Sequence, residues 1–397
     1  MAKILLVNKF YYPRGGDCTA TLTLERLLRQ KGHEVAIFST EHPLNIQGEW
    51  NQYFPSEIKF TQGGLYTKIK ATDRIFFSHE VKKKFNQLLE TFHPDILHAH
   101  NIHSYLSPYI IKLAASKGIK TVWTLHDYKL ICPVYTCLRD NSTCELCLHN
   151  KYAVLQHKCM KNSFAGSFIA FLEACVWNKN ILEKYTDTFI SPSHFLKGMM
   201  VKAGYNSNKI QVLHNFIESP STTVHSFQKE DYYCYVGRLS PEKGVERLLQ
   251  AAQDIPYTLK IVGDGELSGY LKQKYNHKHI HFLGQQPREK VLEIVGKARF
   301  SVVPSIWYEN NPFSIIEALC VGTPVIGSRI GGIPELIESG ENGDLFTPLS
   351  KEEMKEKITD SIKLYNDTYP FATIAKNAQD KFSAETFYNN LIQIYEQ

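Results

Sequence analysis

The chain has 397 residues, which is too long for one ordinary hydrophobic core, so we expect two domains. Its 43% hydrophobic and 21% charged residues are typical of a folded globular protein and argue against a disordered or repetitive chain. The sequence has no apolar run of about 18 residues that could span a membrane, and no secretory leader pattern precedes the first predicted strand. These features predict a cytoplasmic protein.

The two halves of the chain carry opposite charge. Residues 1–215 contain 26 Lys and Arg against 16 Asp and Glu, and residues 216–397 contain 19 against 24. The first half is therefore at +10 and the second at −5. A basic half predicts an anionic partner such as a membrane surface or a lipid diphosphate, rather than nucleic acid, although solvated helix faces would give the same count.

The N-terminal residues predict a strand, a helix and a second strand at 3–7, 19–31 and 34–39. The loop between the first strand and the helix contains Gly15, Gly16 and Asp17. It lies at the carboxyl end of a strand, where open parallel sheets bind their ligands. Paired glycines there let backbone approach a phosphate or a sugar closely, and an ordinary turn is the alternative.

Two further strands, at 93–100 and 119–125, end in polar residues. His100, Asn101 and His103 follow the first, and His126 and Asp127 follow the second. We expect them at one rim of the sheet. The spacing of the histidines is only a weak indication of metal, because three ligands would have to leave one strand together.

The middle of the first half is unusual in two ways. Five of the nine cysteines fall between 132 and 159, which allows a structural zinc held by Cys132, Cys144, Cys147 and Cys159, or unligated thiols. Residues 163–178 are apolar on most of a helical circumference. Such a helix can lie on a bilayer, helped by lysines at its ends, or pack in the core.

Residues 215–225 lose periodicity, and we place the linker there. A strand at 232–236, a helix at 245–252 and strands at 259–262 and 279–283 then restart the alternation, with Gly263 after the third element. This pattern predicts a second doubly wound sheet. Arg238 and Lys243 follow its first strand and could neutralise a diphosphate.

The stretch 300–332 combines a loop and an apolar helix with a buried strand that is expected at 299–304. Asn311 is the expected N-cap and Pro312 the first helical residue, with the helix ending at Gly322. Free N–H groups from Asn310 to Phe313 suit a phosphate, and two carboxylates, Glu309 and Glu317, suit the hydroxyls of a sugar nucleotide. The alternative is that Glu317 pairs with a core Arg and Glu309 is solvated.

Five of these motifs in order resemble the retaining glycosyltransferases of family 4. They are Gly15-Gly16, His126-Asp127, Gly237-Arg238 with Glu242-Lys243-Gly244, Gly263-Asp264-Gly265, and Glu309 with Glu317. The resemblance covers nearly the whole chain. Ser314 departs from it, because the family often has glycine there, so the identity of the donor is less transferable.

The resemblance implies the GT-B fold, an α/β fold in which two Rossmann-like domains face a cleft. It implies an acceptor domain at 1–215, a donor domain at 216–382 and a final helix at about 383–397 that crosses back to the first domain. It also implies catalytic roles for His126, Arg238, Lys243 and Glu309; donor contacts from Gly15, Gly16, Arg238, Lys243, Gly263, Asn310, Asn311, Pro312, Phe313 and Glu317; and acceptor-side positions at Asp17, His100, Asn101 and Asp127.

The activity so implied is transfer of a hexose, with retention, from a nucleotide-diphosphate sugar to a glycan acceptor in cell-surface polysaccharide synthesis. We expect a UDP- or GDP-sugar, no catalytic metal and no cofactor, because cations already lie at the diphosphate. The basic first half favours a lipid-linked acceptor and peripheral contact with the inner membrane face. A sugar-nucleotide epimerase and a non-catalytic nucleotide-sugar-binding partner remain the alternatives.

Overall fold

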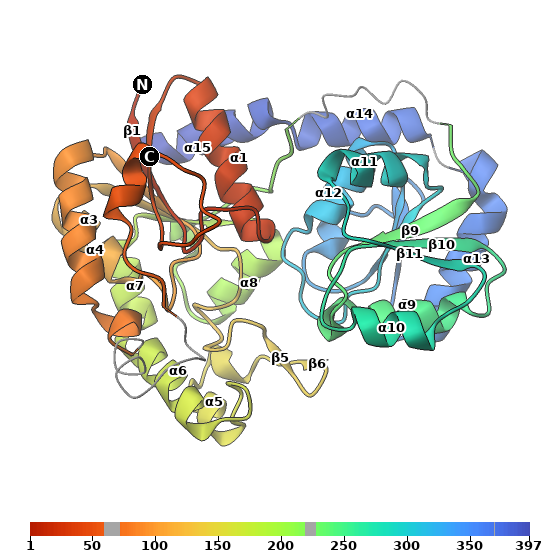
Figure 1. The fold of residues 1–397 in the computed structure, drawn as a ribbon, viewed down its shortest axis with the longest axis horizontal. Helices are drawn as coiled ribbons and strands as arrows, with labels where there is room; N and C mark the ends of the chain where they lie inside the picture. Colours follow the sequence, from red (N-terminus) through yellow and green to blue (C-terminus); the bar gives the residue numbers. More distant parts are fainter. Residues whose placement is uncertain (59–71, 219–227, 369) are drawn as a thin grey trace. The chain divides into compact units, whose positions relative to one another are not determined.

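A computed structural model describes residues 1–58, 72–218, 228–368 and 370–397. The chain divides into two compact units (Figure 1). Unit 1 contains residues 1–137, 144–214 and 387–397, and unit 2 contains residues 138–143 and 215–386. Of the linker expected at 215–225, residues 219–225 lie outside the described part of the chain.

Unit 1 is built on a six-stranded parallel sheet with the order β2-β1-β3-β4-β7-β8. The strands are buried along most of their length, as expected where helices cover both faces of a parallel sheet. Their bounds are β1 Lys3–Val7, β2 Glu34–Phe38, β3 Ile96–Ala99, β4 Lys120–Thr124, β7 Thr188–Ser191 and β8 Ile210–Val212.

Helices from both ends of the sequence pack on this sheet. The side chains of α1 and of the C-terminal helix α15 share one apolar cluster with β1 and β2, in which Leu391, Ile394 and Tyr395 are buried. The helical elements of this part of the chain are α1 Gly16–Gln30, η1 Glu49–Tyr53, α3 His79–Phe92, α4 Tyr109–Ser116, η2 Leu146–Leu148, α5 Ala153–Gln156, α6 Phe164–Val176, α7 Lys179–Tyr185, α8 His194–Lys202, η3 Ser207–Lys209 and α15 Ala384–Glu396.

Unit 2 repeats the plan with the strand order β11-β10-β9-β12-β13-β14, again all parallel. The strands are β9 Tyr232–Val236, β10 Thr258–Val262, β11 Ile280–Gly284, β12 Ser301–Val303, β13 Val325–Ser328 and β14 Gly343–Phe346. The helical elements are η4 Pro241–Lys243, α9 Val245–Ala252, α10 Ser268–Lys274, α11 Arg288–Lys297, α12 Phe313–Cys320, η5 Ile333–Glu335, α13 Lys351–Thr368 and α14 Phe371–Lys381. A short antiparallel hairpin, β5 Leu138–Arg139 with β6 Ser142–Thr143, groups with this unit.

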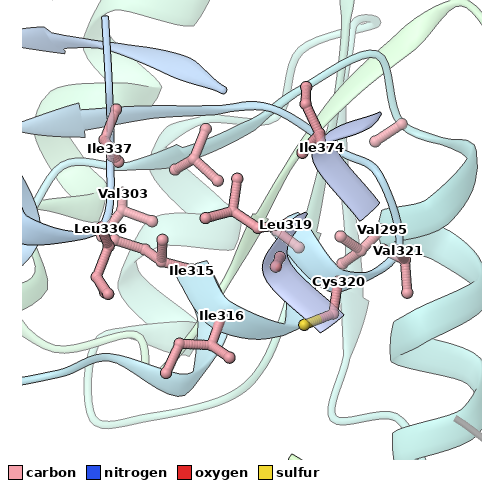
Figure 2. Packing of buried hydrophobic residues seen from close by; sticks show 14 of the residues in the cluster. Val295, Val303, Ile315, Ile316, Leu319, Cys320, Val321, Leu336, Ile337 and Ile374 are labelled. Carbon is pink, nitrogen blue, oxygen red and sulfur yellow. The ribbon is translucent and has the colours of Figure 1, made fainter. Parts of the chain in front are cut away.

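Alternate residues of β9 supply two separate cores. Tyr232 and Cys234 face a cluster formed with α11, α12 and α14, whereas Tyr233 and Tyr235 face one formed with α9, α10 and α13. Figure 2 shows the first cluster, where α12 lies against residues of β12 and α14. The two-residue period of a strand explains how a continuous apolar run can fill both layers.

Two helix starts differ from the sequence prediction. Helix α1 begins at Gly16 instead of Thr19, with extended Gly15 as its N-cap, and this brings Asp17 into the first turn, where a carboxylate favours the helix dipole. Helix α12 begins at Phe313 with Pro312 as its N-cap, so the prediction of an Asn311 cap is wrong. The Asn311 carboxamide oxygen instead accepts a hydrogen bond from the backbone N–H of Asn215 at 2.8 Å.

Candidate active site

Lys243 and Glu309 form an ion pair in unit 2. Lys243 closes η4 after β9, and Glu309 lies in the loop after β12; because β9 and β12 are neighbouring parallel strands, their carboxyl ends place these loops together. Lys243 Nζ lies 2.7 Å from Glu309 Oε1, which also accepts a hydrogen bond from Ser305 Oγ at 2.6 Å. The sequence alternative of a solvated Glu309 is therefore wrong.

Burial and charge act in opposite directions on Glu309, which is only 6% exposed. Burial raises the pKa of its carboxyl, but the Lys243 ammonium and the Ser305 hydroxyl outweigh this, and the pKa lies below its usual value. The Glu309 carboxylate is thus ionised. The Lys243 side chain keeps 24% of its surface exposed, and its Nζ lies 5.0 Å from the centroid of the Trp307 ring. Because an ammonium has three donors, Lys243 can bond to Glu309 and to an anion together.

Two glycines let the loops around this pair come together. Gly244 has φ of +66°, and a Cβ there would lie 1.9 Å from the Pro304 carbonyl oxygen. Gly331 has φ of +60°, and a Cβ there would lie 2.3 Å from the carbonyl oxygen of Glu309. A side chain at either position would force the backbone beside the ion pair to move.

Arg238 and Gly263 follow β9 and β10, so they lie at the same edge of the sheet as Lys243. The Arg238 side chain is exposed, while its backbone carbonyl accepts a hydrogen bond from the Tyr235 hydroxyl at 2.8 Å. The N–H of Gly263 donates to the Gly284 carbonyl at 2.9 Å. The local backbone is thus fixed, while the guanidinium remains on the surface.

Glu317 projects from α12 and pairs with Arg288 of α11 at 3.1 Å. Burial raises the pKa of the Glu317 carboxyl, and Arg288 offsets this only in part. The Arg288 side chain is 41% exposed, so this partner is a surface arginine and not the core arginine considered from the sequence. Asn310, Pro312 and the first residues of α12 lie between Glu309 and Glu317 in the sequence, and their side chains are partly exposed.

In unit 1 the predicted polar residues meet at the carboxyl ends of β1, β3 and β4. Asn101 Nδ2 donates to Asp17 Oδ2 at 2.9 Å, and His100 Nδ1 lies 2.8 Å from His126 Nε2. The rings of His100 and His126 are stacked with centroids 5.1 Å apart. Gly15 and Gly16, which precede Asp17, have no positive φ, so the backbone alone does not demand glycine there.

The environment holds Asp17 ionised and His126 neutral. Burial raises the pKa of Asp17, but the Lys9 ammonium and the hydrogen bonds from the Asn101 amide and the Cys18 N–H outweigh it, and the pKa is lowered. Burial lowers the pKa of His126 to about 4, although Asp17 opposes this. Burial also raises the pKa of Asp127, whose Oδ1 accepts a hydrogen bond from the Lys129 N–H at 2.9 Å.

The structure adds residues that the sequence argument missed. Lys9 influences both Asp17 and His126, and only its place after the first strand could have indicated this. His98 stacks on His100 with centroids 4.6 Å apart, as the two-residue period of a strand allows. Nothing in the local sequence indicates Arg288 or Ser305.

The cysteine cluster favours the second of the two sequence alternatives, unligated thiols. All nine cysteines lie in the described ranges as reduced thiols, and the Cys132 thiol is hydrogen-bonded with those of Cys137 and Cys147. Over the described ranges, no group of three or more His, Cys, Asp or Glu side chains is arranged to hold a metal ion. The predicted zinc set of Cys132, Cys144, Cys147 and Cys159 is therefore not formed in this structure.

Comparison with known proteins decides the family. Residues 14–219 match the family described as Glycosyltransferase Family 4, and residues 222–379 match Glycosyl transferases group 1. The chain belongs to glycosyltransferase family 4. This family 4 glycosyltransferase is 26% identical, over 352 residues, to an uncharacterized 42.6 kDa protein in the cps region of Klebsiella pneumoniae; the match covers 84% of this chain and 87% of that one.

Solved structures identify the fold of the family 4 glycosyltransferase as GT-B. Anabaena Alr3699/HepE, crystallised in complex with UDP and glucose, has a TM-score of 0.68 at 18% identity and covers all of both chains. The lipopolysaccharide outer core galactosyltransferase WaaB has a TM-score of 0.66 at 18% identity over 99% of both chains. Among the helices in the described ranges, none has the length and apolar character needed to cross a membrane.

Proposed function

We propose that this glycosyltransferase moves a hexose, with retention, from a nucleotide-diphosphate sugar to a glycan acceptor in cell-surface polysaccharide synthesis. The observation that carries the proposal is the Lys243–Glu309 pair, in which a partly exposed lysine is held by a buried carboxylate at the edge of the sheet of unit 2. Such a fixed cation suits a diphosphate. The first turn of α12 and the exposed Arg238 supply further positive partners.

The charges fit the bond that must break. Cleavage of a sugar–diphosphate bond places negative charge on the leaving phosphate and positive charge on the sugar ring. In the proposal Arg238 and Lys243 stabilise the first of these, and preorganised cations of this kind act mainly in the transition state. They also take the place of a metal ion at the diphosphate, so we propose that catalysis is metal-independent.

The position of Glu309 argues against a nucleophilic role. Its Oε1 already accepts from both Lys243 and Ser305, so the carboxylate is engaged. We therefore propose that Glu309 orients Lys243 and receives hydroxyls of the transferred sugar, while the leaving phosphate takes the proton of the acceptor. Glu317 is proposed for the ribose, and neutral His126 for a hydrogen bond to the reacting sugar.

The donor and acceptor are proposed from relatives. The Anabaena neighbour was crystallised with UDP and glucose, so a UDP-hexose is the first donor to test and a GDP-sugar the second. The names of the Klebsiella relative and of the galactosyltransferase refer to a cps region and to the lipopolysaccharide outer core. They favour an acceptor that is a lipid-linked glycan of the cell envelope.

Helix α6 supports contact with the inner membrane face. Its outward residues include Phe164 and Phe168, which are 60% and 43% exposed and stack on each other. Its buried face carries Ser167 and Glu173 instead, and Glu173 pairs with Lys129 at 2.8 Å. An apolar face turned outward is unusual for a helix packed only in a core, and it suits an acyl boundary.

A binding and transfer experiment tests the proposal. UDP, GDP, ADP and dTDP are titrated calorimetrically without added metal against the wild type and Arg238→Ala, and the nucleotide sugar of the best binder is then incubated with lipid-linked glycan acceptors. We expect one nucleotide to bind and the anomeric configuration of the product to match that of the donor. Absence of binding at millimolar concentration, or conversion of the donor to another free nucleotide sugar, would contradict it.

A further inference from the structure

His100 and His126 form a hydrogen-bonded pair in unit 1. His100 follows β3 and is only 2% exposed, and its Nδ1 lies 2.8 Å from Nε2 of His126, which lies in the loop after β4. Because so little of its side chain is exposed, His100 has almost no surface to offer an acceptor sugar. Its one ring hydrogen bond within the described ranges is the bond to His126.

The backbone of His100 is held from two sides. Its N–H donates to the Val7 carbonyl at 2.8 Å, and its carbonyl accepts from the indole N–H of Trp123 at 2.9 Å. Its ring also stacks on that of His98, with centroids 4.6 Å apart. These contacts leave the imidazole of His100 little freedom to turn away from His126.

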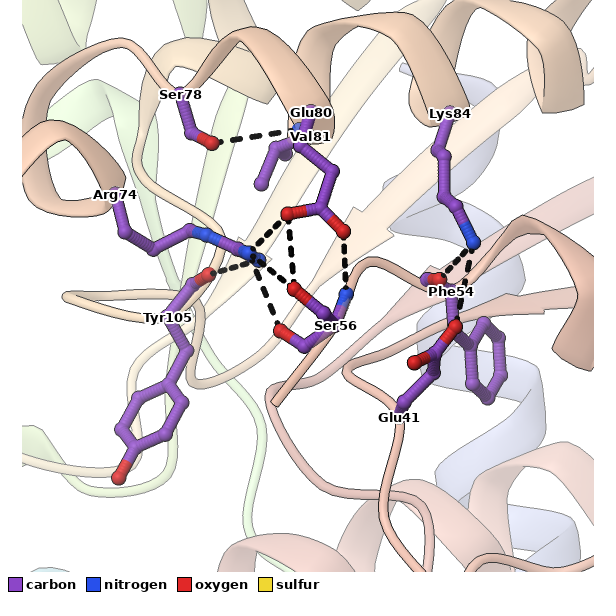
Figure 3. A network of polar contacts seen from close by, with 9 residues as sticks. All are labelled: Glu41, Phe54, Ser56, Arg74, Ser78, Glu80, Val81, Lys84 and Tyr105. Atoms are coloured by element: carbon purple, nitrogen blue, oxygen red, sulfur yellow. Dashed lines mark hydrogen bonds and ion pairs between the residues drawn. The ribbon is translucent and has the colours of Figure 1, made fainter. Parts of the chain in front are cut away.

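The loop that begins at His100 is also held at its far end. Figure 3 shows the guanidinium of Arg74, which donates to the Tyr105 carbonyl at 3.5 Å and pairs with Glu80 of α3 at 2.8 Å. Arg74 is fully buried, and Glu80 accepts hydrogen bonds from the N–H and the hydroxyl of Ser56. A buried network therefore anchors this loop, as the preorganisation of a polar pair requires.

The two imidazoles share one proton at their contact. Burial lowers the pKa of the His126 imidazole to about 4 and that of His100 well below its usual value, so both are neutral near pH 7. A neutral imidazole has one N–H and one bare nitrogen. The bond can therefore take two forms. If His100 donates, His126 carries its own proton on Nδ1; if His126 donates, it carries that proton on Nε2.

The other nitrogen of His100 distinguishes these forms. Its Nε2 is buried and has no hydrogen-bond partner within the described ranges. If His126 donated, Nε2 of His100 would carry a proton, and an N–H would be buried without an acceptor. Buried N–H groups without an acceptor are rarer in native proteins than buried acceptors without a donor. The form in which His100 donates is therefore favoured.

His126 then has one ring nitrogen left for a ligand. Its Nε2 is engaged by His100, whereas its Nδ1 makes no hydrogen bond within the described ranges and the residue is partly exposed. We propose that His100 is a positioning residue, whose Nδ1–H donates to Nε2 of His126 and so presents the Nδ1–H of His126 to a hydroxyl oxygen of the transferred sugar. The inference rests on the proposed function, and it replaces the acceptor-side role predicted for His100.

Nitrogen NMR on the full chain without ligand tests the pair, because protonated and bare imidazole nitrogens give distinct signals. The 16 histidines are isotope-labelled, and the signals of His126 are those that disappear in His126→Gln. We expect His126 to carry its proton on Nδ1 near neutral pH. A proton on Nε2 of His126 would overturn the proposal.

Two variants separate a positioning role from a merely structural one. In His100→Asn a carboxamide N–H can replace the imidazole donor, so His126 should keep its proton on Nδ1. In His100→Leu no donor remains, and His126 should show a mixture of the two protonated forms. His98→Gln is the matched control, because His98 is equally buried but bonds to Tyr395 and Thr124, so the His126 proton should stay on Nδ1. Identical His126 signals in the wild type and in His100→Leu would contradict the proposal.

Folding and activity are read separately. If circular dichroism shows that His100→Leu is unfolded, the decision rests on the wild type and His100→Asn, where a proton on Nε2 of His126 refutes the role. With a donor established, kcat should stay within about threefold of the wild type in His100→Asn and fall about tenfold or more in His100→Leu, and an unchanged kcat in His100→Leu would overturn the role. The spectra need no nucleotide, so they stay decisive if UDP and GDP fail to bind, an outcome that refutes the proposed function alone.

Discussion

The ammonium of Lys243 and the carboxylate of Glu309, 66 residues apart in the sequence, lie 2.7 Å from each other at the ends of two adjacent strands. The relationship changes how each residue is to be tested. Removal of one partner leaves the other charge poorly compensated, so a loss of activity in a single variant mixes local unfolding with lost chemistry. The pair has to be perturbed as a unit.

A double-mutant cycle separates these effects. Lys243→Met should lower the free energy of unfolding by about 1–3 kcal/mol, because it leaves the Glu309 carboxylate buried without the ammonium that balances its charge. The double variant Lys243→Met/Glu309→Gln should recover most of that stability. It should nevertheless bind nucleotide more weakly than the wild type, because the cation is still absent. Urea unfolding and calorimetric titration on the four proteins measure both quantities. Additive stability losses in the double variant would show that the pair is not coupled.

Arg238 offers a cleaner test of the donor site. Its side chain is exposed and only its backbone takes part in a hydrogen bond of the loop, so Arg238→Ala should leave the unfolding midpoint unchanged. Turnover should fall by about 10²–10³-fold if the guanidinium stabilises the leaving diphosphate. Arg247→Ala, which removes the same charge from α9, is the matched control and should retain activity. Equal kcat values for the two variants would count against the assigned role.

The strands and helices could be predicted from the sequence because apolar runs and glycine turns are local signals. The bounds predicted for the strand at 232–236 and the helix at 245–252 agree with β9 and α9. The prediction that His100 and His126 lie at one rim is also confirmed, because they follow two neighbouring parallel strands whose carboxyl ends lie at the same edge of the sheet. Neighbouring strand ends can therefore be predicted from the sequence.

Partners across long separations could not be predicted in the same way. The sequence predicted Asn311 as an N-cap. Its side-chain oxygen instead accepts a hydrogen bond from the backbone N–H of Asn215, 96 residues away, and no local sequence pattern indicates such a contact. Arg288 reaches Glu317 only because α11 and α12 pack together. The choice of partner depends on tertiary packing, which overrides the local capping preference.

Buried histidines should make unit 1 sensitive to acid. Burial lowers the pKa of His98 to about 3 and that of His126 to about 4, below the usual value of 6.5. At pH values between the folded pKa of each histidine and 6.5, the unfolded chain binds more protons than the folded one. The contribution of each neutral, buried histidine to the free energy of unfolding is therefore complete above about pH 6.5, and it is lost as the pH falls toward the folded pKa. At pH 5 the loss should reach roughly 2 kcal/mol for each histidine.

The measurement is urea unfolding at pH 7.5 and pH 5 followed by tryptophan fluorescence, because three of the four tryptophans, Trp50, Trp123 and Trp177, belong to unit 1. His98→Gln keeps a side chain that can bond to Tyr395 and Thr124 and should reduce the difference between the two pH values by up to about 2 kcal/mol. His157→Gln on the surface is the control. An unchanged pH dependence in His98→Gln would refute the explanation.

The outward face of α6 predicts binding to anionic membranes. Replacement of Phe164 and Phe168 by serine removes two exposed rings, and it should lower the fraction that floats with vesicles of equal parts phosphatidylglycerol and phosphatidylethanolamine by about tenfold or more. Lys158→Gln and Lys161→Gln should each reduce binding by about fivefold at low salt, since a lysine near an anionic surface contributes about 1 kcal/mol.

Leu44→Ser is the matched control for α6, because Leu44 is also strongly exposed in unit 1 but lies on the loop after β2. It should float like the wild type. Light scattering on the same proteins tests whether a second copy of the chain covers the apolar face instead. Membrane contact would be refuted if the phenylalanine substitutions dissociate a dimer and leave flotation unchanged. Because Glu173 on the opposite face of α6 pairs with Lys129, two residues after Asp127, a confirmed membrane contact would join the lipid surface to the loop that carries Asp127, one of the predicted acceptor-side residues.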